Sequence, residues 1–291
     1  MEHSELISHT VNLPEYPNEK IELITAGNNE AGKAIVFIHG ATLTYQLMTI
    51  FMPYFNNYQL IFVNAPGRGN STPVERNKDD LTTYTKRINS ALIQAKDKLN
   101  LKDITLVGYS MGGVISTKIL SYNSLPISHV VYLNSAGRVD MEKSAVARIV
   151  SKIRAGQLSE DDPNTLEAFP EFGFGSKTPK EFIESIDFVQ FQASFESSMT
   201  DILYTAGTDY LADLSEVQNF PKALFLLGED DQIIPNSDSK TTQARFEELG
   251  VHTKMITYPG VGHLDFPRIV EKPSDDNHDS LVHYIQDWLN D

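Results

Sequence analysis

The sequence contains no cysteine among its 291 residues. A chain without thiols forms no disulfide, no cysteine-ligated zinc site, no iron–sulfur cluster and no cysteine nucleophile. Because disulfides are typical of secreted proteins, their absence favours a cytoplasmic location. The first residues, Met1–Leu6, lack the basic start and the apolar run of a signal peptide, which agrees with that expectation.

Long apolar runs and clustered positive charges are also lacking. No stretch of 18 apolar residues occurs, so we expect no transmembrane helix. Lysine and arginine total 24 against 39 aspartate and glutamate residues, which gives a formal net charge of −15. A surface of this charge repels nucleic acid and anionic lipid, so we expect neither nucleic acid nor a membrane as a partner. With 41% hydrophobic residues, the chain still carries enough apolar surface for an ordinary core.

Short apolar runs alternate with longer helical segments in the first part of the chain. Apolar side chains recur at helical spacing in Asp79–Leu99, and Met111–Tyr122 continues as a second helix. Strands separated by helices predict βαβ units and a mostly parallel central sheet flanked by helices, the α/β class. The predicted strands are Ile21–Ala26, Ala34–Ile38, Gln59–Asn64, Asp103–Gly108 and His129–Leu133.

The alternation stops after residue 137 and resumes near residue 218. The intervening segment, 138–217, shows no strand pattern, and its predicted helices are Ser144–Ala155, Pro179–Phe195 and Met199–Asp209. Two further strands and two helices follow it, at Ala223–Leu227, Ser239–Leu249, Thr253–Tyr258 and Asp279–Leu289. The sequence therefore predicts one α/β core, made of residues 1–137 and 218–291, with a helical cap inserted at 138–217.

The motif Gly108-Tyr109-Ser110-Met111-Gly112 lies between a predicted strand and a predicted helix. A serine in such a sharp turn needs small neighbours, which Gly108 and Gly112 supply. The turn exposes Ser110 as a candidate nucleophile at a helix N-terminus, where the partial positive charge favours an oxyanion. A serine hydroxyl reacts at neutral pH only with a base to accept its proton and an acid to hold that base.

Two later loops carry the missing base and acid. Gly228–Pro235 follows a predicted strand and contains Asp230 and Asp231. Pro259–His263 follows the next strand and places His263 in a glycine-rich loop. The order serine, aspartate, histidine is that of a nucleophile, an acid and a base in an α/β architecture.

Together these segments resemble the α/β-hydrolase fold superfamily, and in particular its serine-esterase-like members with a helical cap inserted after the sixth core strand. The resemblance covers nearly the whole chain and rests on Phe37–Gly40, Ala65–Ser71, Gly108–Gly113, Gly228–Asp231 with Pro235, and Gly260–His263. It favours Asp231 over Asp230 as the acid. It also implies an oxyanion hole made by the backbone N–H groups of Ala41 and Met111, with His39 and Gly40 shaping the loop.

The same resemblance implies acyl transfer to water through an acyl-enzyme, without a metal or organic cofactor. We expect a small-molecule substrate, a small or medium apolar carboxylic ester, and leave the oligomeric state open. Thioesterase, C–C bond hydrolase, amidase and perhydrolase chemistry remain alternatives on the same three residues, as does a ligand-binding sensor. A serine nucleophile argues against haloalkane dehalogenase and epoxide hydrolase chemistry, in which the family uses aspartate.

The walls of the expected pocket are predicted less specifically. Most phenylalanines of the insertion are expected to pack the cap against the core, because aromatic residues at helical spacing are usually buried, and the others to line the pocket. Those phenylalanines are Phe169, Phe172, Phe174, Phe182, Phe188, Phe191 and Phe195. Further candidates for the walls are Tyr45, Met48, Met52 and Met111.

Overall fold

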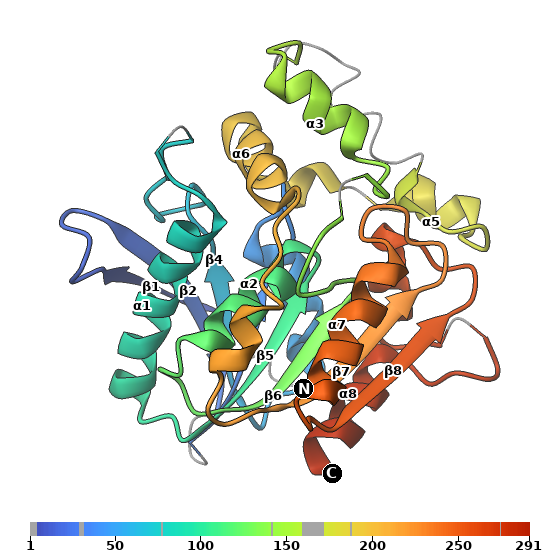
Figure 1. Ribbon diagram of the computed structural model, residues 1–291. Helices are drawn as coiled ribbons and strands as arrows, with labels where there is room; N and C mark the ends of the chain where they lie inside the picture. The colour runs from blue at the N-terminus through green and yellow to red at the C-terminus, as the bar shows by residue number, and fades with distance from the viewer. Residues whose placement is uncertain are drawn as a thin grey trace.

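A central sheet of eight strands organises the protein (Figure 1). The computed structural model describes residues 5–28, 32–76, 78–140, 142–158, 172–186, 188–273 and 275–291. The strand order is β1-β2-β4-β3-β5-β6-β7-β8. Pairing is antiparallel for β1 with β2 and for β2 with β4, and parallel for every other pair. The predicted α/β class with a mostly parallel sheet is confirmed.

All seven predicted strands lie within observed ones. The observed strands are β1 Ile7–Asn12, β2 Lys20–Gly27, β3 Lys33–Ile38, β4 Gln59–Asn64, β5 Asp103–Tyr109, β6 Ile127–Leu133, β7 Lys222–Gly228 and β8 Thr253–Tyr258. Strand β1 was not predicted, because it is an edge strand whose side chains are mostly exposed and no apolar pattern marks it. The 3-10 helix η1, Tyr45–Tyr54, was not predicted either.

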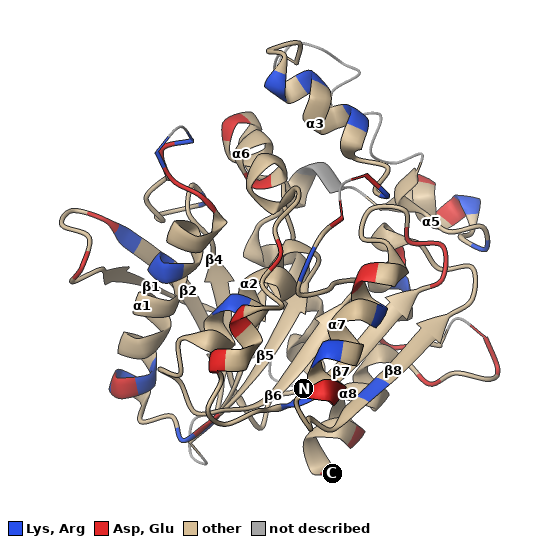
Figure 2. Ribbon diagram, in the orientation of Figure 1, with Lys and Arg blue, Asp and Glu red and all other residues tan. Residues whose placement is uncertain are grey.

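Helices cover both faces of the sheet and complete two cores. One face carries α1 Leu81–Leu99, α2 Met111–Ser121 and α7 Asn236–Glu248, and the other carries η1 and α8 Leu281–Asn290 (Figure 1). Alternate residues of a strand enter opposite cores, as Val36 and Phe37 do in β3. This explains the continuous apolar runs: strands buried on both faces have no polar side. Charged residues accordingly lie on helices and loops, and the central strands are almost free of them (Figure 2).

The segment between β6 and β7 is helical, as predicted; all its helices but the last gather at one end of the sheet, whereas the last packs against α2 (Figure 1). They are α3 Ala147–Arg154, α5 Lys180–Ser185, η2 Phe188–Phe191, α6 Phe195–Thr205 and η3 Asp213–Glu216. The predicted continuous helix Pro179–Phe195 is wrong, because the chain breaks after Ser185 and α6 begins afresh. The side chain of Ser194 caps α6 by accepting the Ser197 N–H at 3.3 Å, so α6 starts four residues before the predicted Met199.

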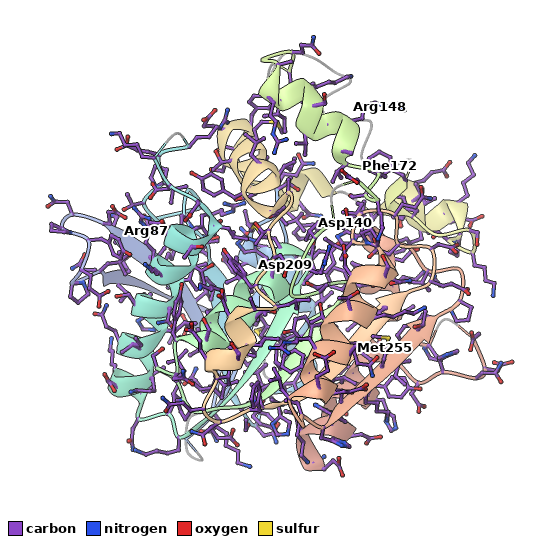
Figure 3. All side chains as sticks on the ribbon, viewed as in Figure 1. Arg87, Asp140, Arg148, Phe172, Asp209 and Met255 are labelled. Carbon is purple, nitrogen blue, oxygen red and sulfur yellow. The ribbon has the colours of Figure 1, made fainter. Side chains whose placement is uncertain are left out.

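The two chain segments that enter and leave the insertion run side by side. Arg138 and Asp209 form an isolated antiparallel bridge, flanked by the hydrogen bond from Val139 N–H to the Thr208 carbonyl at 2.8 Å. The Arg138 guanidinium also contacts carboxylates, at 3.3 Å for Asp209 and 3.1 Å for Asp238 of α7. Figure 3 labels Asp140 and Asp209 in this region. The exact boundaries 138 and 217 stay a prediction.

Two expected properties concern what the described residues lack. No helix in the described ranges is both long and apolar enough to cross a membrane. Within those ranges, His, Asp and Glu side chains form no group of three or more that could hold a metal ion. The expectation that the protein works without a metal or cofactor stays a prediction.

Candidate active site

Ser110 occupies the strained turn between β5 and α2. Its backbone angles are φ 53° and ψ −122°, a conformation that residues other than glycine rarely adopt. Two glycines make the turn possible: a Cβ on Gly108 would lie 2.5 Å from the Gly112 carbonyl, and one on Gly112 would lie 2.0 Å from the Ile38 carbonyl oxygen. The strain is held in place, because the Ser110 N–H donates to the Leu133 carbonyl at 3.1 Å. The predicted glycines therefore meet a steric need.

A chain of hydrogen bonds joins the three predicted residues. The Ser110 Oγ lies 2.9 Å from Nε2 of His263, and Nδ1 of His263 lies 2.7 Å from Oδ2 of Asp231. The other oxygen of Asp231 accepts the N–H groups of Ile233 and Ile234, both at 2.9 Å. A carboxylate in this position only accepts, so Nδ1 carries the imidazole proton and Nε2 is free to accept the Ser110 hydroxyl proton.

The structure separates Asp231 from its neighbour. Asp230 turns toward the insertion, where its Oδ2 accepts the Ser176 N–H at 2.6 Å. Hydrogen bonds from the side chain and backbone of Ser176 lower the pKa of Asp230. Asp231 is the one that meets His263, as the resemblance implied; its role as the acid remains a proposal.

His39 fixes the orientation of the Ala41 N–H. Nε2 of His39 accepts the Ala65 N–H at 3.2 Å, so Nδ1 must be protonated and donates to the Gly40 carbonyl at 2.8 Å. That carbonyl and the Ala41 N–H belong to the same planar trans peptide and point in opposite directions. Anchoring one on His39 therefore aims the other away from it. Gly40 allows the loop to approach, since a Cβ there would lie 3.0 Å from the Cβ of Ser110.

The burial of His39 predicts a stability that depends on pH. Burial, with a contribution from the Arg68 guanidinium, lowers the pKa of His39 from 6.5 to about 3. The unfolded chain therefore gains a proton below pH 6.5 that the folded chain does not, and stability falls as the pH drops toward 3. Urea unfolding at pH 7 and pH 5.5 should show wild type losing about 1 kcal/mol more than His39→Gln. Equal losses in the two proteins would contradict a neutral, buried imidazole.

The two predicted oxyanion donors flank Ser110. Met111 is the first residue of α2, and Ala41 lines the same pocket as Ser110 and His263. Among the described residues, neither the Ala41 N–H nor the Met111 N–H donates to a protein acceptor. Both donors are thus left for a ligand, and their role as the oxyanion hole stays a prediction.

Comparison with known proteins places the chain in a family. Residues 35–275 match the family described as "Alpha/beta hydrolase family". The chain belongs to the alpha/beta hydrolase family. A Mycoplasma pneumoniae protein named as an esterase/lipase is 26% identical over 237 residues, which cover 78% of this chain and 81% of that protein. The (E)-2-((N-methylformamido)methylene)succinate hydrolase of Acinetobacter baylyi is 24% identical, over 72% of this chain and 76% of its own.

Solved structures of other proteins share the fold of this alpha/beta hydrolase. A lipase-esterase related protein from Clostridium acetobutylicum gives a TM-score of 0.72 at 17% identity, covering 92% of this chain and 99% of that one. The 2-hydroxy-6-oxo-6-phenylhexa-2,4-dienoate hydrolase of a Rhodococcus strain gives 0.72 at 14% identity, covering 99% and 100%. At these identities the likeness establishes the fold alone.

Two polar residues that sequence analysis did not assign to the site brace the loops of this alpha/beta hydrolase. Asn134, at the end of β6, accepts the Gly228 N–H at 2.7 Å and donates to the His263 carbonyl at 2.9 Å. It thus joins the loops of the predicted acid and base. The buried Asp265 accepts the Gly262 N–H at 2.6 Å and the Gly175 N–H at 2.8 Å, which ties the histidine loop to the insertion. Nothing in their sequence spacing marks these contacts.

An apolar pocket of about 70 Å³ opens beside Ser110 and His263 in this alpha/beta hydrolase. The core supplies part of its wall and the insertion supplies the rest, including Ile202, Thr205 and Ala206 of α6 and the following turn. No lysine, arginine, aspartate or glutamate is among its described lining residues. Those residues are Ala41, Thr42, Leu43, Tyr109, Ser110, Val139, Val146, Ile202, Thr205, Ala206, Ile233, Ile234, His263 and Leu264.

The predicted walls are therefore corrected. Tyr45, Met48, Met52 and Met111 do not line the pocket, and Met48 and Met111 are fully buried in the two cores. None of the insertion's phenylalanines with a described side chain lines it either. Phe172 (Figure 3) and Phe195 pack against the core of α1 and α2, and Phe191 packs against the opposite one. Phe169 and the side chain of Phe188 lie outside the described residues.

Proposed function

We propose that this protein is a serine hydrolase that cleaves small apolar carboxylic esters through an acyl-enzyme. The observation that carries the proposal is the unbroken hydrogen-bond chain from Ser110 through His263 to Asp231. The esterase/lipase name of the Mycoplasma pneumoniae relative supports the same chemistry.

The proposed reaction proceeds in two halves. Ser110 Oγ attacks the ester carbonyl while Nε2 of His263 takes its proton, and Asp231 stabilises the imidazolium. The carbonyl oxygen becomes an oxyanion held by the N–H groups of Ala41 and Met111. His263 then returns the proton to the leaving alcohol, which leaves an acyl group on Ser110. Water deprotonated by His263 attacks that acyl group, and collapse of the second oxyanion releases the acid and restores Ser110.

The pocket favours the small end of the predicted substrate range. A cavity of 70 Å³ holds roughly five to seven water-sized groups, at about 10–15 Å³ each. Its walls are mostly apolar and carry no lysine, arginine, aspartate or glutamate among the described residues, so a charged acyl group would lose its hydration without gaining an ionic partner. We therefore propose acyl groups of about two to six carbon atoms, which is the size that this volume admits.

A panel of chromogenic esters tests the proposed function. Wild-type protein should hydrolyse p-nitrophenyl acetate and butyrate much faster than the dodecanoate, and a fluorophosphonate should label it on Ser110. Thioesters, anilides and a vinylogous diketone belong in the panel, because the same three residues serve thioesterases, amidases and C–C bond hydrolases. Absence of both turnover and labelling would contradict the hydrolase proposal and favour a ligand-binding sensor.

Enlarging the pocket should shift the preferred chain length. Ile202 lies on α6 against the pocket and is 6% exposed. Ile202→Ala removes three carbon atoms from the wall, so the ratio of kcat/KM for the hexanoate to that for the acetate should rise about tenfold. Ile149→Ala is the matched control, because Ile149 is also buried in the insertion but does not line the pocket. An equal change of the hexanoate-to-acetate ratio in both variants would show that Ile202 does not set the chain-length preference.

A further inference from the structure

A carboxylate of the insertion reaches into the core beside the predicted oxyanion loop. Asp201 lies on α6, and its side chain is 1% exposed. Its Oδ2 accepts the Thr42 N–H at 3.0 Å, although the two residues are 159 positions apart. Its Oδ1 accepts the Tyr84 hydroxyl at 3.2 Å. A buried charge this far along the chain thus holds one backbone N–H next to Ala41.

The buried charge of Asp201 is neutralised by an arginine that serves the same loop. Arg68, also 1% exposed, forms an ion pair with both carboxylate oxygens of Asp201. Its Nε donates to the Leu43 carbonyl at 2.9 Å, and its Nη1 donates to the Pro66 carbonyl at 2.8 Å. Since each charged group has its hydrogen bonds made, the pair can sit in the interior without a large penalty. Together, Asp201 and Arg68 bind the residues on either side of the Thr42–Leu43 peptide.

The position of Thr42 explains why the hydrogen bond from its N–H to Asp201 affects Ala41. Thr42 has φ 66°, a left-handed conformation unfavourable for a β-branched residue. The Thr42 N–H belongs to the Ala41–Thr42 peptide, and the Ala41 N–H belongs to the preceding one. His39 holds that preceding peptide by its carbonyl, and Asp201 holds the following peptide by its N–H. Ala41 is therefore clamped on both sides by buried side chains, one from the core and one from the insertion.

We propose that Asp201 is a positioning residue for the oxyanion hole: through Thr42 it sets the direction of the Ala41 N–H, so that α6 must be docked for full catalysis. The inference rests on the proposed ester hydrolysis. It makes the insertion part of the catalytic geometry and not only a wall of the pocket.

A purely structural role is the alternative. Backbone hydrogen bonds already join the loop to the chain before α6, from Thr44 N–H to the Phe191 carbonyl at 2.8 Å and from Ala193 N–H to the Thr42 carbonyl at 2.7 Å. A substitution at Asp201 removes neither of these backbone bonds, so we expect the loop to keep its path without the carboxylate. A positioning role then predicts a lower kcat in a variant that keeps its fold, whereas a purely structural role predicts an unchanged kcat.

Two paired variants isolate the hydrogen bond to Thr42. Asp201→Leu with Arg68→Met removes both charges and the acceptor, whereas Asp201→Asn with Arg68→Met removes both charges and keeps an oxygen for the Thr42 N–H. We expect the leucine pair to show a kcat on p-nitrophenyl butyrate about 10–100-fold below that of the asparagine pair, at similar KM. Butylboronic acid, whose adduct with Ser110 carries an anionic oxygen, should bind the leucine pair more weakly by a similar factor.

The outcomes separate this inference from the proposed function. Equal kcat in the two pairs, or a difference confined to KM, would overturn the positioning role while wild-type turnover upheld the hydrolase. If the leucine pair does not fold, replacing Thr42 by its α-hydroxy acid removes only the N–H and must give the same loss of kcat. Arg87→Met with Glu19→Gln is the control, since it breaks the ion pair that Arg87 of α1, labelled in Figure 3, forms with Glu19, and it should leave kcat unchanged.

Discussion

Replacing Ser110 by alanine should lower kcat by about 10⁶-fold, to the level left by substrate binding and the proposed oxyanion hole. The Ser110 Oγ has one protein partner in the described residues, Nε2 of His263 at 2.9 Å, so the substitution removes the proposed nucleophile and little packing. Alanine must still adopt φ 53°, which costs it no more than it costs serine. Steady-state hydrolysis of p-nitrophenyl butyrate and labelling by a fluorophosphonate measure the effect independently.

Ser121→Ala provides the matched control for that measurement. Ser121 is also buried on α2, and its hydroxyl donates to the Lys118 carbonyl at 2.8 Å, away from the site. This variant should keep wild-type turnover and labelling. A Ser110→Ala protein that is folded, by thermal unfolding, and still hydrolyses esters near the wild-type rate would show that another group is the nucleophile.

Asp231→Asn should lower kcat by about 10⁴-fold, through the wrong tautomer of His263. The N–H groups of Ile233 and Ile234 both require an oxygen, so the asparagine carbonyl will face them. Its amide then points at Nδ1 of His263, which must accept instead of donate. The imidazole proton moves to Nε2, where it can no longer take the proton of Ser110. The loss should appear in kcat with the fold intact.

Asp230→Asn tests the same assignment from the neighbouring position. Its oxygen can still accept the Ser176 N–H, and the wild-type carboxylate has no hydrogen bond to His263. Turnover should therefore stay close to that of wild type. A larger loss for Asp230→Asn than for Asp231→Asn would reverse the assignment of the acid.

The parts of the structure that were predictable are those encoded locally. Strands buried on both faces appear in the sequence as continuous apolar runs. The turn at Ser110 requires small residues at 108 and 112 for steric reasons, and the sequence has Gly108 and Gly112 there. Asp231 and His263 follow strands that end at the same edge of a parallel sheet. The candidate site could be predicted residue by residue because its members sit at fixed offsets from such elements.

What could not be predicted depends on contacts between distant segments. Part of the apolar pocket wall comes from Ile202 and Ala206, at and just after the end of α6. The start of α6 depends on a cap at Ser194, which lies inside the longer helix predicted from the sequence. Asp201 bonds Thr42 across 159 residues, and Asn134 bonds the His263 carbonyl across 129. No spacing rule relates such positions, so these roles are visible only in the folded molecule.

The two ends of the insertion lie side by side, so we expect that it can be exchanged as a unit between relatives. Because Gly137 and Tyr210 are hydrogen-bonded at 3.1 Å where the chain enters and leaves the insertion, the first requirement for a replacement lid is to span two adjacent ends. Lid-swapping between relatives could then change substrate choice without redesigning the sheet. A transplanted lid lacking a carboxylate at the place of Asp201 would leave Arg68 without its partner, so a successful chimera must carry that acid or replace both residues.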